Sequence, residues 1–274
     1  MQTIVYNGSF EGFLCAVFDV YEYKLNDVHI VPAHKHQPSL FAEPHIANFD
    51  LQHSERVWQG LQKKLTIEAQ DGLYRCFLSE IDGIEDTLLE YIRYVFSSEQ
   101  FMETDFSNEA VLTVVQTAKK VWREKHRMEA FVRFQHTADD LYYAIIDPDY
   151  NVLPLVAKHF ETRYANQRWL IYDSRRRFGL YYDEQSVNTV QLNFSSTTAE
   201  GKDVSAVYDE SEGIYQQLWK QYFKSVNIAA RKNTKLHIQR MPRRYWKFLP
   251  EKTPLTTGAG GLQDRLTNWT YRRA

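Results

Sequence analysis

The chain has 274 residues, of which 43% are hydrophobic and 25% charged, and its formal net charge is −2 at pH 7. This composition excludes a disordered or collagen-like chain and suits one large globular domain or two smaller ones. No apolar run approaches the roughly 18 residues of a membrane helix, and the N-terminus lacks the pattern of a signal peptide. Two cysteines, Cys15 and Cys76, are too few for a disulfide framework. We therefore expect a soluble cytoplasmic protein without a membrane partner.

The first half of the chain has the apolar periodicity of helices. After a short strand, apolar residues recur at helical spacing from Phe10 to Tyr21, and Ser9 before them has the side chain of an N-cap. A second strand is predicted over VHIVPAH, and a proline-containing loop follows it. Further helices are predicted at about 54–66, 84–98 and 108–126. The last of these is expected to bury Val111, Val114, Val115, Ala118, Val121 and Trp122.

Runs rich in β-branched and aromatic residues begin near residue 127. The predicted strands are AFVRF, LYYAIID, RWLIYDS, FGLYYD and VNTVQLNF, and helices are predicted over LPLVAKHFETRYA and SEGIYQQLWKQYFKSV. The predicted fold is α+β, with a mainly helical N-terminal half followed by a mostly antiparallel sheet with packed helices and a basic C-terminal segment. The predicted regions are 1–126, 127–252 and a flexible tail at 253–274, with one continuous domain over 1–252 as the alternative.

The segment 231–252, RKNTKLHIQRMPRRYWKFLPEK, concentrates positive charge. Eight of its residues are Lys or Arg and only Glu251 is acidic, although the whole chain is slightly acidic. Lysine and arginine neutralise phosphates, so such a segment favours nucleic-acid binding. The alternative is a solvated basic tail that packs on the acidic remainder. Tyr245 and Trp246 within it either stack on an exposed base or cover the core beneath them.

A second basic run, DSRRRFG, contains Arg175, Arg176 and Arg177. Three arginines at the end of a strand are suited to clamping a phosphate. The alternative is an exposed hairpin turn without a ligand.

The chain shows no strong enzyme motif. The P-loop, GxGxxG, GxSxG, HExxH and the cysteine pattern of an iron–sulfur cluster are absent from the sequence. Five of the nine histidines lie in the first 53 residues, but at irregular spacing, so we predict neither a metal nor a cofactor. Asp173 beside Arg175 and His159 beside Arg163 are the candidate acid–base groups.

Four blocks of the chain resemble a known bacterial family. They are VYNGSFEGFLCAVFD, RMEAFVRFQ, VLPLVAKHFETRYANQRWLIYDSRRRFGLYYD and NIAARKNTKLHIQRMPRRYWKFLPEK. The chain is similar over about residues 3–252 to DNA metabolism or DNA repair proteins whose C-terminal half is a domain of unknown function. Members typically sit beside a radical SAM protein of DNA repair, and some relatives are fused to a uracil-DNA glycosylase-like domain. The resemblance therefore implies DNA and a radical SAM protein as partners.

We predict a DNA repair or DNA modification accessory protein that binds single-stranded or damaged duplex DNA. A DNA-processing enzyme for base excision or nucleotide processing, and a docking subunit without direct DNA contact, are the alternatives. Arg243, Arg244, Tyr245 and Trp246 are assigned to the site because they lie in the matching MPRRYW block. The predicted nucleic-acid-binding residues are Arg175, Arg176, Arg231, Lys232, Asn233, Lys235, His237, Gln239, Arg240, Arg243, Arg244, Tyr245 and Trp246.

Overall fold

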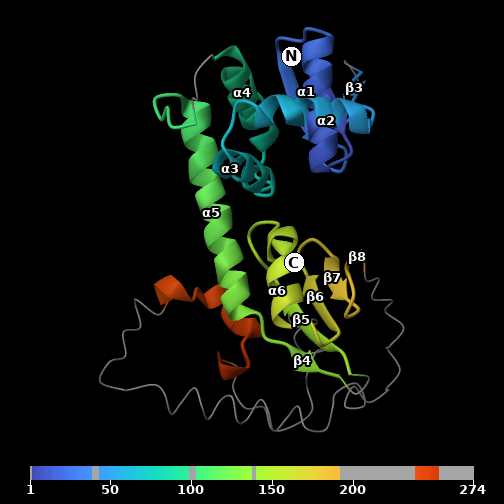
Figure 1. Ribbon diagram of the computed structural model, residues 1–274, viewed down its shortest axis with the longest axis vertical. Coiled ribbons are helices and arrows are strands. Elements are labelled where there is room, and N and C mark those ends of the chain that lie inside the picture. Colours follow the sequence, from blue (N-terminus) through green and yellow to red (C-terminus); the bar gives the residue numbers. More distant parts are fainter. Residues whose placement is uncertain (1, 39–42, 99–102, 138–139, 192–237, 253–274) are drawn as a thin grey trace. The chain divides into compact units, whose positions relative to one another are not determined.

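The computed structural model describes residues 2–38, 43–98, 103–137, 140–191 and 238–252 (Figure 1). The chain divides into two compact units. Of the described residues, those within 2–124 and 149–151 form unit 1, and those within 125–148 and 152–252 form unit 2. The predicted α+β class is confirmed, since helices dominate the N-terminal half and a five-stranded sheet follows.

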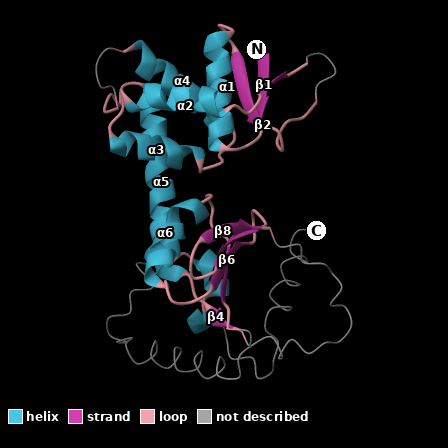
Figure 2. Ribbon diagram, turned by 45° about the vertical axis from the view of Figure 1, so that its right-hand side comes forward, coloured by secondary structure: helices cyan, strands magenta, loops and turns pink. Residues whose placement is uncertain are grey.

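Unit 1 begins with a small parallel sheet in the order β2-β1-β3. Its strands are β1 (Gln2–Tyr6), β2 (Val28–Pro32) and β3 (His45–Ile46). Parallel strands need a crossover connection, and α1 (Phe10–Glu22) supplies it between β1 and β2 and packs against β1 (Figure 2). The predicted N-cap is confirmed, because the Ser9 hydroxyl accepts a hydrogen bond of 3.0 Å from the Gly12 amide.

Four more helices follow in the described part of the N-terminal half. They are α2 (Leu51–Gln62), α3 (Ile67–Phe77), α4 (Ile84–Ser97) and α5 (Glu109–Phe131). One apolar core joins α1 to α4, the start of α5 and the sheet, with Phe13, Leu61, Leu88 and Ile92 fully buried. The strand predicted over AFVRF is wrong. Helix α5 continues to Phe131, because Met128 gives its last turns a buried contact that keeps the helical register.

Unit 2 is built on a mixed sheet in the order β4-β5-β6-β7-β8. Its strands are β4 (Gln135–His136), β5 (Tyr142–Ile146), β6 (Trp169–Asp173), β7 (Phe178–Tyr182) and β8 (Val187–Val190). All neighbouring pairs are antiparallel except β5 and β6, which are parallel and joined through α6 (Leu153–Arg163). Phe160 of α6 packs edge-on against Trp169 of β6 in the core of this unit.

The described part of the basic segment is folded onto unit 2. Two short 3₁₀ helices, η3 (Arg243–Phe248) and η4 (Pro250–Lys252), end the described chain, and η3 packs against β5. Tyr245 is 2% exposed and its ring lies 5.8 Å from that of Phe131, while Leu249 is fully buried. These two side chains anchor the segment.

Several predictions lie outside the described residues. They are the helix over SEGIYQQLWKQYFKSV, residues 231–237 of the basic segment and the tail at 253–274. Among the helices that the structure does describe, none combines the length and the apolar character needed to cross a bilayer.

Candidate nucleic-acid interface

Two basic segments that are about 70 residues apart in the sequence meet at one carboxylate in unit 2. Arg175 Nε donates to Asp147 Oδ1 at 3.0 Å, and Lys247 Nζ donates to Asp147 Oδ2 at 2.8 Å. Arg175 belongs to the turn between β6 and β7, and Lys247 belongs to η3. Asp147 therefore links the arginine turn to the basic C-terminal segment.

The parallel pairing of β5 and β6 places Asp147 at this position. Ile146 at the end of β5 is paired with Asp173 at the end of β6, so the carboxyl ends of both strands lie at the same edge of the sheet. The Ser174 amide donates to the Ile146 carbonyl at 3.0 Å and extends this pairing by one step. Asp147 follows β5 directly and so meets the turn that follows β6.

Asp173 holds the arginine turn together. One oxygen of its fully buried carboxylate accepts from the amides of Arg175 at 2.9 Å and Arg176 at 3.1 Å. The other oxygen accepts from Arg176 Nη1 at 3.0 Å. Arg176 also donates to the Pro148 carbonyl, so its guanidinium is directed inward. Arg175 and Arg177 are exposed, and Arg177 has a positive φ of 60° that closes the hairpin.

The two aspartates have pKa values shifted in opposite directions. Burial alone raises the pKa of the Asp147 carboxyl, but the hydrogen bonds and charges of Lys247 and Arg175 outweigh it and hold the pKa below its ordinary value. Burial raises the pKa of Asp173, and the charge of Arg176 opposes that rise only in part. Asp147 is thus an ionised anchor for two cations.

Aromatic rings and cations alternate along η3. The Arg243 guanidinium lies 5.9 Å and the Lys252 ammonium 5.2 Å from the Trp246 ring. The Arg244 guanidinium lies 4.6 Å from the ring of the buried Tyr245. Tyr245 therefore covers the core, which was one of its two predicted roles. Trp246 is half-buried, and its indole N–H donates to the Met241 carbonyl at 3.0 Å.

The structure places the remaining predicted binding residues as follows. Gln239 and Arg240 are exposed in a helical turn just before η3. The other five predicted residues lie outside the described part of the chain, namely Arg231, Lys232, Asn233, Lys235 and His237.

The two predicted acid–base candidates are not brought together. Asp173 is committed to the turn, with no exposed surface for a substrate. His159 lies on α6, where its Nδ1 is 3.6 Å from Glu129 Oε1 and its ring packs edge-on against Phe160. No hydrogen bond or ion pair between Asp173 and His159 occurs in the described structure.

Sequence reasoning missed Asp147 and Lys247 as partners. In the sequence, Lys247 counts only as one charge of the basic segment, and Asp147 is only the last residue of the strand predicted over LYYAIID. An acidic residue directly after an apolar strand was the available signal. Its partners depended on a parallel pairing that the sequence did not reveal.

A family match and a structural likeness relate the chain to known proteins. No curated protein matches the chain. A solved structure of a pGpG-specific phosphodiesterase from Vibrio cholerae is similar at 11% sequence identity and a TM-score of 0.33, over 66% of this chain and 81% of that one. A likeness of this size carries no argument about activity. The domain of unknown function DUF4130 matches residues 82–251. Because this match covers more than half of the chain, the protein belongs to the DUF4130 family.

Proposed function

We propose that this protein is an accessory factor of DNA repair or DNA modification that binds DNA through the surface around Asp147. The observation that carries the proposal is the meeting of the arginine turn and η3 at that carboxylate. We call the exposed cations of these two elements the basic surface; they are Arg175, Arg177, Arg243, Arg244 and Lys247.

The charge of the basic surface suits a phosphodiester backbone. Two of the five cations of the basic surface pair with the ionised Asp147 carboxylate, which leaves an excess of positive charge in a chain of slightly negative net charge. Cations that contact DNA phosphates displace condensed counterions, and this release favours binding most strongly at low salt. Asp147 fixes the position of Arg175 and Lys247, so the entropy cost of ordering these side chains on a phosphate is smaller.

Trp246 supports a preference for single-stranded or damaged DNA. Its half-buried ring is flanked by Arg243 and Lys252. An aromatic ring beside cations can stack on an unpaired base while the cations contact the neighbouring phosphates. An intact duplex offers no unpaired base for this contact.

Fluorescence anisotropy with single-stranded and duplex oligonucleotides over a salt series tests this proposal. We expect salt-dependent binding, and the double variant Arg243→Ala/Arg244→Ala should lower the salt slope by about one unit for each arginine that binds a phosphate. Lys158→Ala is the matched control, because Lys158 is an exposed cation on α6 that pairs with Glu161. Affinity and slope that stay unchanged in the double variant would contradict the proposal.

We further propose that the protein works with a radical SAM protein of DNA repair. The support is the family resemblance of the four sequence blocks. Co-purification of the two proteins should persist after nuclease treatment if they bind directly. Loss of the partner on nuclease treatment would instead make DNA the bridge between them.

A further inference from the structure

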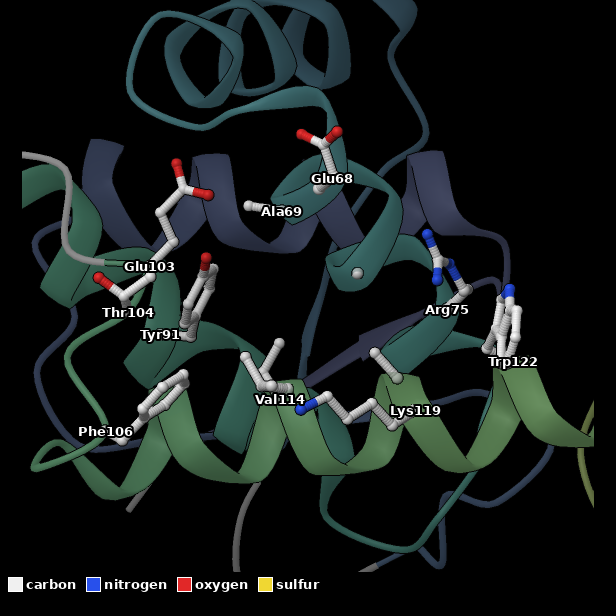
Figure 3. Close-up of a pocket in the computed structure, with 13 residues that line it drawn as sticks. Glu68, Ala69, Arg75, Tyr91, Glu103, Thr104, Phe106, Val114, Lys119 and Trp122 are labelled. Carbon is white, nitrogen blue, oxygen red and sulfur yellow. The ribbon is translucent and has the colours of Figure 1, made fainter.

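Unit 1 contains a pocket of about 410 Å³ that the DNA-binding proposal does not use (Figure 3). Residues from α3, α4, the segment 103–106 and the first part of α5 line it. Its volume lies within the range of about 300–1,000 Å³ that is typical of small-molecule sites. In Figure 3, Tyr91 and Phe106 lie on one side of the pocket and Arg75 and Trp122 on the other.

Tyr91 brings an unused hydrogen-bond donor to the pocket. Its side chain is only 2% exposed, and its hydroxyl has no hydrogen-bond partner among the described residues. Burial raises the pKa of this phenol well above its usual value, so the hydroxyl keeps its proton. Water can reach this hydroxyl at the pocket, since it is not one of the buried side-chain atoms that lack a partner in the described structure. A ligand with an acceptor atom in the pocket would take the place of that water.

The walls of the pocket are apolar and partly aromatic. Val114 and Ala118 of α5 are buried in its lining, and Gly72 of α3 leaves room where another residue would place a side chain. Phe106 and Trp122 are 51% and 50% exposed, although Trp122 was predicted to be buried. Each of these half-exposed aromatic side chains offers stacking surface to a planar ring at its own side of the pocket.

Two of the four charged side chains that line the pocket form no ion pair with the described residues. Arg75 is paired with Asp71 at 3.3 Å, and Glu103 accepts from the Thr66 amide at 2.8 Å. In contrast, Glu68 and Lys119 form neither an ion pair nor a side-chain hydrogen bond within the described structure. The pocket therefore offers one free carboxylate, one free ammonium and one buried hydroxyl donor around an apolar interior.

We propose that this pocket binds a mononucleotide. The base would lie against the exposed ring of Phe106, with a ring nitrogen or carbonyl oxygen accepting from Tyr91, which lies on the same side of the pocket. An exocyclic amino group would donate to Glu68, and the phosphate would contact Lys119. The proposal is independent of the DNA-binding function, because it rests on residues of unit 1 alone.

Isothermal titration of the full-length protein with AMP, GMP, CMP and dTMP, and with the matching nucleosides, tests the assignment. We expect binding of at least one mononucleotide with a submillimolar Kd. Tyr91→Phe keeps the ring and should weaken binding about threefold to tenfold, since it deletes one hydrogen bond. Lys119→Gln should weaken binding of the nucleotide but leave the nucleoside unaffected, because only the nucleotide carries the phosphate.

The thermal unfolding midpoint separates this reading from a merely structural role of Tyr91. Without ligand, Tyr91→Phe should unfold at nearly the same temperature, because the Tyr91 hydroxyl makes no hydrogen bond to the described residues. Tyr74→Phe is the matched control, since Tyr74 lies on α3 and packs against Phe10 instead of lining the pocket. The proposal is overturned if no mononucleotide binds below millimolar concentration, or if Tyr91→Phe binds as tightly as the unchanged protein.

Discussion

Asp147 is the residue on which the basic surface depends. It is a single carboxylate that accepts one hydrogen bond from each of two cationic segments, and its side chain is 15% exposed. A charged group in such a position acts in two opposite ways. It stabilises the fold by holding Arg175 and Lys247, and it weakens anion binding by neutralising part of their charge.

Asp147→Asn should therefore destabilise the protein while tightening its binding to DNA. We expect the free energy of unfolding at pH 7 to fall by about 1 kcal/mol, a modest value because Arg175 and Lys247 are nearly half exposed. DNA affinity at fixed salt should rise several-fold, because one negative charge leaves the surface. Glu161→Gln, which removes an acid from a surface pair on α6, is the control. Weaker DNA binding by Asp147→Asn would show that the carboxylate serves mainly to position the cations.

The same variant gives a defined pH dependence. The folded pKa of Asp147 lies below its unfolded value, so its contribution to stability is present above about pH 3.9 and is lost as the pH falls through the folded pKa. Urea unfolding should thus show a difference between the variant and the unchanged protein at pH 7 that disappears in strong acid. A difference that is constant from pH 7 to pH 2 would mean that the charge of Asp147 does not stabilise the fold.

The arginine turn is the element that presents the basic surface, and its geometry is strained. Arg177 adopts a φ of 60°, and its amide donates to the Asp173 carbonyl at 2.8 Å to close the hairpin. A left-handed conformation costs a residue with a side chain roughly 1–2 kcal/mol, whereas glycine adopts it freely. A cation is therefore kept at a position where glycine would be more stable.

Arg177→Gly should raise the stability of the protein and weaken its binding to DNA. We expect the free energy of unfolding to rise by up to about 1 kcal/mol, because relief of strain exceeds the extra entropy that glycine gives the unfolded chain. The salt slope for DNA should fall by about one unit if Arg177 contacts a phosphate. Arg177→Ala is the control, since it removes the charge but keeps the strain. Equal destabilisation by Gly and Ala would show that the turn is not strained at this residue.

The sequence predicted elements well where the apolar pattern was regular. Helices α1, α4 and α6 and strands β5, β6 and β7 match their predicted segments closely. Helix α3 was missed, because its 11 residues include Gly72 and only two of its side chains are buried, which leaves little periodicity to detect. The arginine turn was predicted as a possible hairpin, but its contact with η3 was not, since long-range pairing leaves no local pattern.

At the scale of the whole molecule, each of the two units has fully buried side chains of its own among the described residues. Leu88 is fully buried in the core of unit 1, and Ile171 is fully buried among the side chains of the unit 2 sheet. That the regions 1–126 and 127–252 are separate domains stays a prediction. Chains with more than one compact unit commonly lose structure in separate cooperative steps.

Leu88→Ala and Ile171→Ala should each destabilise one unit by about 2–5 kcal/mol, because each removes buried methyl groups and leaves a cavity. Amide hydrogen exchange followed by mass spectrometry can locate the loss of stability. Leu88→Ala should speed exchange in α1 and α4 while β6 and β7 stay protected, and Ile171→Ala should do the reverse. The surface variant Lys158→Ala should change neither pattern. If either core variant accelerated exchange equally in both units, the chain would unfold as one cooperative body. The DNA binding proposed for unit 2 would then depend on the residues that stabilise unit 1 as well.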